Sequence, residues 1–432
     1  MRQVKRSGRL VVPVGLALAM LTACGGGDGD DGAHGGAPHP EGGGRSTPAA
    51  AKSYDPPLRF RDEPAQDIAG GINEGNWSVE LEDTTAYAVS DEEVRAVSVL
   101  DGRKLWSVKA QGQPAEDTDY GTDGIGGPHL VEVGGHTAVL AAFSVTEPGS
   151  GTTPDRPLVE LTAVAADSGK RLWTSTVERP EGKEESEPYV AGAGSGTAVL
   201  TFGDDTDAVT IGVSLTTRET AWTEKGFRAS FVDGGIAVGR GGADSILGAG
   251  ATVEGREVTD GTKAWTYKDR LNRTELTRVG DGLFTAVVDA PFEDPNNSGA
   301  LLTTSTGKPP AGLVASKALG RPTDLSCWSD EDSAVVCKAA KGVDERVVAL
   351  DPGNWTELWS VAGDDKTRLM PRISTMYHGA VYGTTDNGSV ILDARTGKDK
   401  ASGTGDAPIE VNGYAGLFAG SLGVIESHRA TG

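Results

Sequence analysis

One short pattern recurs along most of this chain and constrains its fold more than any other feature. Each copy contains a β-rich strand, a polar turn, a second β-rich strand and a final turn that is usually a glycine. These final turns fall near residues 102, 169, 218, 261, 307, 353, 397 and 432, so most steps are 43–49 residues long. A repeat of between 40 and 50 residues that is built from short strands is typical of β-propeller blades. No long segment of the sequence shows the periodicity of an amphipathic helix.

A tryptophan recurs in one slot of this pattern, four residues after the final turn of four copies, and two residues late in a fifth. A buried tryptophan covers a large area and needs one partner for its indole N–H. We therefore predict that these side chains dock neighbouring blades and do not bind a ligand. The predicted docking residues are Trp106, Trp173, Trp222, Trp265 and Trp359, together with Trp77, which precedes the first copy.

The two ends of the repeat region complement each other. The last copy stops at Gly432 and lacks the strand that should follow, whereas an unassigned strand, Gly75-Asn-Trp-Ser-Val79, precedes the first copy. We expect this N-terminal strand to complete the last blade, which would close the ring and remove exposed sheet edges. The sequence thus predicts an all-β, eight-bladed propeller over residues 72–432. Seven blades would result if the last copy only pairs with the first.

The clearest repeat ends are Leu350-Asp-Pro-Gly353, Leu392-Asp-Ala-Arg-Thr-Gly397 and the Gly-x-x-x-Trp spacings that end at Trp106, Trp173 and Trp265. They resemble the repeat ends of the pyrroloquinoline-quinone (PQQ)-like β-propellers, the quinoprotein dehydrogenase-like superfamily. The resemblance covers most of residues 72–432. It bears on the fold far more than on the activity, because one fold hosts many functions.

By this resemblance, a relative with enzymatic activity would use PQQ and a calcium ion, and many such enzymes carry a disulfide between two adjacent cysteines. This chain has no adjacent cysteine pair. Asp294, Asn296 and Asn297 lie together as possible oxygen ligands, but they surround Pro295 and are interpreted as a turn. No active-site residue of the family is carried over, so we predict no cofactor and no metal ligand.

Other catalytic patterns are also missing from the sequence. The histidines of the repeat region lack metal-ligand spacing, and its glycine-rich stretches lack the strand–loop–helix context of a phosphate-binding loop. These histidines are His129, His136, His378 and His428. The residues therefore favour a non-enzymatic role, with a PQQ- and metal-dependent oxidoreductase as the alternative.

The N-terminus has the three regions of an export signal. Arg2, Lys5, Arg6 and Arg9 supply positive charge, an apolar run follows, and Leu21-Thr-Ala-Cys24 ends the segment. This ending resembles a bacterial lipobox, which implies that residues 1–23 are a signal peptide and that Cys24 bears a lipid. The apolar run is too short to span a bilayer, which takes about 20 residues. An ordinary secretory signal is the alternative.

The segment that follows has the composition of a tether. Residues 25–52 contain ten glycines and three prolines. Such a segment buries too little apolar surface to offset its ordering entropy. We therefore assign residues 24–71 to a flexible tether and expect a lipid-anchored protein on the extracytoplasmic face of the cell membrane.

Two cysteines remain after Cys24. Cys327 and Cys337 lie in two apolar strands separated by a polar turn, an arrangement that would place them opposite each other on a hairpin. Extracytoplasmic compartments are oxidising, so we predict a structural disulfide between them.

Charge narrows the set of partners. The chain has 40 basic and 62 acidic residues, a net charge of -22, which argues against nucleic acid and against a polybasic membrane contact. We predict a binding or scaffolding module at the cell envelope, with one or more envelope proteins as partners. The insertions at 111–128 and 147–157 are the first candidates for its contact face, because loops often carry function. A sensor of a small ligand or a cell-wall glycan is a further alternative.

Overall fold

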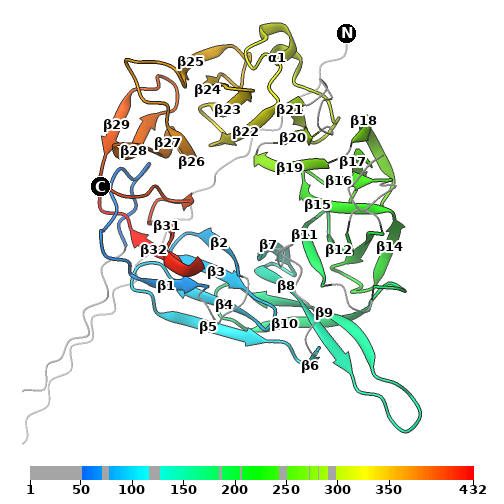
Figure 1. Ribbon diagram of the computed structural model, residues 1–432. Helices are drawn as coiled ribbons and strands as arrows, with labels where there is room; N and C mark the ends of the chain where they lie inside the picture. The colour runs from blue at the N-terminus through cyan, green and yellow to red at the C-terminus, as the bar shows by residue number, and fades with distance from the viewer. Residues whose placement is uncertain are drawn as a thin grey trace, which may run out of the picture. The chain divides into compact units, whose positions relative to one another are not determined.

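Each repeat folds into one antiparallel sheet, because small and β-branched residues fill both faces of its strands while glycines turn the chain. The computed structural model describes residues 51–70, 77–115, 127–183, 187–204, 207–242, 251–271, 273–280, 282–289 and 298–432. All of them belong to one unit, residues 50–432. They form eight sheets, the blades of a ring (Figure 1). The prediction of an all-β, eight-bladed propeller is confirmed, and the seven-bladed alternative is wrong.

The blades follow the chain in order. Blade 1 contains β2 (Ser78–Glu82), β3 (Thr85–Val89), β4 (Glu93–Ser98) and β5 (Lys104–Lys109). Blade 2 contains β6 (Gln113–Pro114), β7 (His129–Val133), β8 (His136–Glu147), β9 (Arg156–Ala165) and β10 (Arg171–Glu178). Blade 3 contains β11 (Tyr189–Gly194), β12 (Thr197–Phe202), β13 (Val209–Ser214) and β14 (Thr220–Lys225). Blade 4 contains β15 (Phe227–Asp233), β16 (Ile236–Gly241), β17 (Ala251–Glu257) and β18 (Lys263–Leu271).

The second half differs at blades 5 and 8. Blade 5 contains β19 (Arg273–Gly280), β20 (Leu283–Asp289) and β21 (Ser298–Thr303), followed by the helix α1 (Ala311–Ser316). Blade 6 contains β22 (Asp324–Ser329), β23 (Val335–Lys341), β24 (Asp344–Leu350) and β25 (Glu357–Ala362). Blade 7 contains β26 (Arg372–Tyr377), β27 (Ala380–Thr385), β28 (Gly388–Asp393) and β29 (Asp399–Ser402). Blade 8 contains β30 (Glu410–Val411), β31 (Ala415–Ala419), β32 (Ile425–Arg429) and β1 (Gln66–Ala69), with the 3-10 turn η1 (Ser421–Gly423) between β31 and β32.

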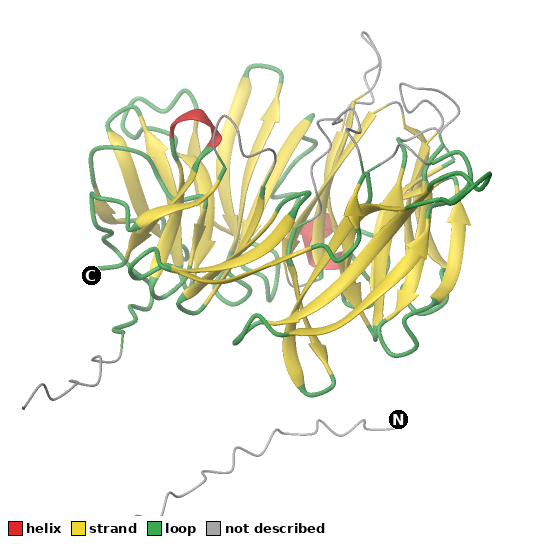
Figure 2. Cartoon of the chain, turned by 90° about the horizontal axis from the view of Figure 1, so that it is seen from below, coloured by secondary structure: helices red, strands yellow, loops and turns green. Residues whose placement is uncertain are grey.

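Within a blade, the first strand lies nearest the centre of the ring and the last lies at its rim. Figure 1 shows this order for β2 to β5, and it shows β11, β15, β22 and β26 around the same central space. Figure 2, turned by 90°, shows that the unit consists almost wholly of strands, joined by loops at their two ends. Side chains on the first strands are therefore the ones placed to line the centre.

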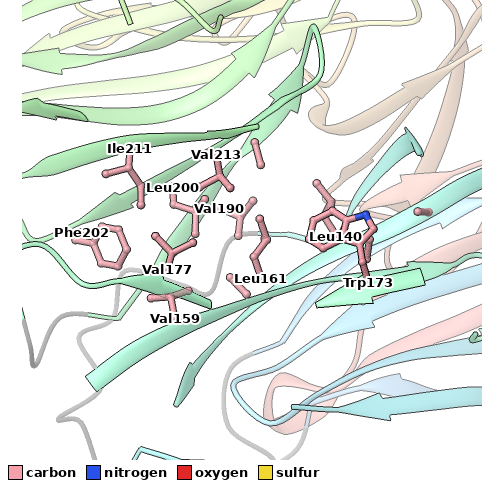
Figure 3. Packing of buried hydrophobic residues seen from close by; sticks show 14 of the residues in the cluster. Leu140, Val159, Leu161, Trp173, Val177, Val190, Leu200, Phe202, Ile211 and Val213 are labelled. Carbon is pink, nitrogen blue, oxygen red and sulfur yellow. The ribbon is translucent and has the colours of Figure 1, made fainter. Parts of the chain in front are cut away.

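The hydrophobic core is divided among the blade interfaces. Between blades 2 and 3, Leu140 and Leu161 of one sheet pack against Leu200 and Ile211 of the next (Figure 3). All four are at most 3% exposed. Full burial of such a side chain contributes about 2 kcal/mol, so a sheet covered on both faces is stabilised by both of its neighbours.

The N-terminal part of the unit closes the ring, but through a different strand from the one expected. β1 pairs with β32 at the rim of blade 8, with Gln66 opposite Ser427. The expected closing segment around Trp77 instead leads into β2, the first strand of blade 1. The boundary predicted at residue 72 is therefore too late. Residues upstream of β1 also contact the propeller, since the Tyr382 hydroxyl donates to the carbonyl of Pro57 over 2.8 Å.

No helix in the described ranges has both the length and the apolar character needed to cross a membrane.

Candidate functional site

The predicted disulfide is present in blade 6. Cys327 of β22 lies directly opposite Cys337 of β23, with their Cα atoms 4.1 Å apart. Both residues are buried within the core between blades 5 and 6. The bond ties the two strands nearest the centre of the ring and takes no part in an exposed site, which fits the structural role expected of it.

Four of the predicted tryptophans make the same kind of contact, each at a different junction between two blades. Each indole N–H donates to a backbone carbonyl in the final turn of the next blade, over 2.8–3.0 Å. The pairs are Trp106 with Ala166, Trp222 with Val258, Trp265 with Thr304 and Trp359 with Ala394. Each ring also lies against the glycine three residues after that carbonyl, so close that a Cβ there would lie within 2.8 Å of the ring. These tryptophans are thus committed to contacts between blades.

Trp173 breaks the pattern, although its sequence context matches. The next turn places Arg218 where the other junctions have glycine, and its guanidinium carbon lies 5.7 Å from the centroid of the Trp173 ring. The buried indole N–H of Trp173 has no hydrogen-bond partner among the described residues. The sixth tryptophan, Trp77, lies outside the slot: Arg95 covers its ring at 3.9 Å, and it packs on the core shared by blades 8 and 1.

The junction between blades 5 and 6 is reversed, and the sequence pattern did not reveal it. Trp355 belongs to the final turn of blade 6, and its ring and the Asn354 carbonyl lie so close to Gly312 of α1 that a Cβ there would be 2.9 Å from each. Here the following blade supplies the tryptophan and the preceding blade the glycine. A tryptophan within a turn that also contains Pro352 and Gly353 was the available signal.

The two predicted contact loops lie on blade 2. The insertion at 147–157 forms the tip of the long β8–β9 hairpin, which projects from the ring at the lower right of Figure 1. In the insertion at 111–128, residues 116–126 lie outside the described part. Its first residues close over the hairpin, because the buried Glu160 carboxylate accepts the backbone N–H groups of Gln111 and Gly112 over 2.8–2.9 Å.

At the tip itself, Arg156 bridges two carboxylates. It contacts Glu147 at 2.7 Å and Glu178 at 2.9 Å, all with exposed side chains. Exposed ion pairs contribute little stability, on the order of 0–1 kcal/mol each. The hairpin is held mainly by its backbone ladder and by buried residues such as Phe143 and Val159.

A second cluster, not predicted from the sequence, comes from first strands near the centre of the ring. Burial, together with the neighbouring charges of Glu410 and Glu82, raises the pKa of Glu80 on β2 to about 7. Burial also raises the pKa of Glu410 on β30, whose carboxylate accepts the Leu81 N–H over 2.9 Å. Glu80 is therefore partly protonated at neutral pH, a property that is frequent at functional sites.

Two further groups face this cluster. Burial lowers the pKa of His129 on β7, whose Nε2 lies 2.9 Å from the Val190 carbonyl. The guanidinium of Arg278 on β19, in blade 5, lowers the pKa values of both Glu80 and His129. Groups from blades 1, 2, 5 and 8 thus share one electrostatic environment, although some of these residues are hundreds of positions apart in the sequence.

No group of three or more His, Cys, Asp or Glu side chains in the described ranges is placed to hold a metal ion. Asp294, Asn296 and Asn297 lie outside these ranges, as does Cys24.

No known protein family and no curated protein matches the chain. Among solved structures, it is similar to the computationally designed Ika8 protein, with 12% identity over 87% of this chain and 99% of that chain and a TM-score of 0.49. It is also similar to BamB from Moraxella catarrhalis, with 14% identity over 82% and 96% of the two chains and a TM-score of 0.45. A quinohemoprotein alcohol dehydrogenase from Comamonas testosteroni shows 13% identity over 85% and 76%, with a TM-score of 0.45. Structural similarity at such low sequence identity supports no inference about function.

Proposed function

We propose that the protein is exported, carries a lipid on Cys24 and acts as a binding or scaffolding module on the extracytoplasmic face of the cell membrane. The export signal and Cys24 support the location, by their resemblance to a lipobox. The observation that carries the binding role is the projecting β8–β9 hairpin, whose tip is exposed while its base is fixed in blade 2.

Rigidity makes this hairpin suitable for docking. Its strands pair over ten residue positions, from Ala138 opposite Ala165 to Glu147 opposite Arg156. The buried contacts of Glu160 hold the neighbouring loop against it. A surface that is already ordered loses less conformational entropy when a partner binds, which leaves more of the contact energy for affinity.

Site-specific photocrosslinking in cells tests the binding role. A photoreactive residue replaces Thr152, which is exposed at the hairpin tip, and a matched variant carries it at Lys366, which is exposed in the loop between β25 and β26. We expect one or a few envelope proteins to crosslink to position 152 and not to position 366. Equal labelling at both positions, or none at 152, would show that the hairpin is not the contact face.

Fractionation of the same cells tests the anchor separately. The unsubstituted protein should sediment with membranes, and Cys24→Ala should move it to the soluble extracytoplasmic fraction. A Cys24→Ala protein that stays with the membrane would contradict lipid attachment at this residue, and it would leave the crosslinking result to be judged by itself.

A further inference from the structure

Blade 5 has three strands in the described ranges, whereas the other blades have at least four. The reason lies in the residues after its final turn. Where the other blades begin their fourth strand, this chain has Lys308, Pro309 and Pro310. Proline has no N–H to donate to a sheet ladder, so the strand cannot continue and the six-residue helix α1 follows instead. α1 lies at the rim beside β21 (Figure 1).

The missing strand leaves a groove of about 540 Å³ between β21 and α1. Ala300 and Leu301 of β21 form one side, and Leu313 and Val314 of α1 form the other. Val314 is 62% exposed, which is unusual for an apolar side chain of this size. The volume lies within the range of about 300–1,000 Å³ that is typical of ligand sites.

The β21 edge beside the groove is already covered. Gly299 donates its N–H to the Pro322 carbonyl, Thr303 donates to the Lys308 carbonyl, and Leu301 is 1% exposed. The affinity of a ligand in the groove therefore comes from its apolar side chains and its charges, and not from pairing with this edge.

The charge around the groove is opposite to that of the chain. Three exposed cations, Lys317, Arg321 and Lys341, line it, and its described lining residues include no carboxylate. Asp344, Glu345 and Asp364 line the adjoining pocket, which shares Arg321 and Lys341 with the groove. None of the three cations forms an ion pair with another described residue. In a chain with a net charge of -22, an apolar groove lined by three unpaired cations would attract an acidic partner.

We propose that this groove, between β21 and α1, binds an extended, acidic peptide segment of a partner protein. Apolar side chains of the segment contact Leu313 and Val314, and its carboxylates face the three cations. The groove lies on a different blade from the β8–β9 hairpin, so this proposal does not depend on the hairpin.

Selection from a phage-displayed library of nine-residue peptides tests the proposal on the full-length protein in vitro. We expect enriched sequences in which apolar residues alternate with Asp or Glu. Binding of a selected peptide should weaken as salt is raised, because exposed charges are screened. Enrichment of basic sequences, or no enrichment above that on a chain with the groove cations removed, would overturn the proposal.

Two triple variants separate this groove from general surface charge. Replacing Lys317, Arg321 and Lys341 by Gln should weaken binding of a selected peptide by roughly tenfold, since each exposed charge contributes a modest share. The matched control replaces Arg103, Lys366 and Lys398, which are exposed on other blades, and should leave binding unchanged. Equal losses in both variants would show nonspecific electrostatic attraction and overturn the site.

A charge pair at one exposed position completes the test without disturbing the core. Val314→Asp places a carboxylate on the rim and should abolish most binding, whereas Val314→Lys should retain it. Similar affinities for the two variants would contradict the proposed placement. If light scattering shows a dimer that Val314→Asp separates, or if the full-length protein binds anionic vesicles in preference to the selected peptides, the occupant is not an acidic peptide.

Discussion

The junction between blades 3 and 4 and the junction between blades 2 and 3 each place a tryptophan from the same slot against the next turn, but the turn residue that faces the ring differs. At the first, Trp222 donates to the Val258 carbonyl and lies against Gly261. At the second, Trp173 meets Arg218, which takes a positive φ of 66° without being glycine, and its N–H finds no partner among the described residues.

The difference shows that the tryptophan alone does not make the junction. The ring can reach the carbonyl only where the turn residue lacks a Cβ, because a side chain there occupies the space of the indole. Gly261 therefore meets two demands at once, a positive φ of 73° and a close approach. Where Arg218 replaces glycine, the ring stays buried but a polar group is left unpaired, which costs on the order of 1–3 kcal/mol.

The reversed junction between blades 5 and 6 also depends on a residue that lacks a Cβ. Trp355 lies against Gly312, so the pair of a ring and a residue without Cβ persists even though its two members have exchanged blades. The physical requirement is thus the close approach of a ring to backbone, and the position of the tryptophan in the repeat is secondary.

The largest effect is expected from Gly261→Ala. A Cβ would lie 2.8 Å from two carbons of the Trp222 ring, and the positive φ adds strain, so we expect a loss of about 3 kcal/mol in the free energy of unfolding. Urea denaturation measures it. Gly234→Ala is the control, because its φ of 56° is also positive but no heavy atom lies within 4 Å of the added Cβ. Equal losses at the two positions would mean that backbone strain alone accounts for the effect.

Replacing each tryptophan by phenylalanine compares the two junctions directly. Trp222→Phe loses volume and leaves the Val258 carbonyl unpaired, so we expect a loss of about 2 kcal/mol. Trp173→Phe loses similar volume but also removes an unpaired buried N–H, so its cost should be about 1 kcal/mol smaller. The two unfolding free energies are measured under one set of conditions. Identical costs would contradict the assignment of the hydrogen bond as the difference.

The effect of Glu80→Gln on the free energy of unfolding should depend on pH, which distinguishes this residue near the centre of the ring from the tryptophan junctions. The pKa of Glu80 is about 7 in the folded chain and near 4.5 when unfolded, so the folded state binds the proton more tightly. Stability from this group is therefore present below about pH 4.5 and is lost as pH rises through 7. Glu80→Gln should have little effect at pH 5 and stabilise the fold by about 1–2 kcal/mol at pH 8, because water near the centre screens part of the repulsion.

The two tryptophan variants should not show this pH-dependent stabilisation. Between pH 5 and pH 8, the unfolding free energies of the Trp222→Phe and Trp173→Phe chains should change by the same amount as that of the unsubstituted protein. A stabilisation by Glu80→Gln that is the same at both pH values would argue against a raised pKa and for a simple packing effect.

The smallest expected effect is a gain. Arg218→Gly relieves the positive φ and opens the space in which Trp173 can approach the Leu215 carbonyl, the counterpart of Val258. We expect a net stabilisation of about 0.5 kcal/mol, because glycine also raises the entropy of the unfolded chain. Arg218→Ala removes the guanidinium but keeps the strain, so it should not stabilise. A gain from both variants would assign the effect to the charge.

Much of the fold could be predicted from local pattern. The period of the repeat sets the number of blades, and the two cysteines flanking a polar turn identify the pair that forms the disulfide. The tryptophan slot also predicts contacts between blades, because its spacing from the final turn repeats. These features are visible because each blade is built from residues that are near one another in the chain.

The candidate sites could not be predicted in the same way. Leu81 donates to Glu410 across 329 residues, and Arg278 acts on Glu80 from a blade on another part of the ring. The raised pKa of Glu80 depends on burial among these groups, and no short stretch of sequence encodes it. The groove of blade 5 likewise depends on where α1 lies relative to β21, although Pro309 and Pro310 were visible as a break in the repeat.

By itself, the sequence determined the repeat, the eight blades and the disulfide, because alternation, glycine turns and cysteine spacing act over a few residues. Only the tertiary structure decided which strand closes the ring, which tryptophans find a carbonyl and which glutamates resist losing a proton. β1 is four residues long and carries one large apolar side chain, Ile68, so its pattern is too weak to identify it. Its place is set by pairing with β32 at the far end of the chain, an interaction that exists only once the ring has formed.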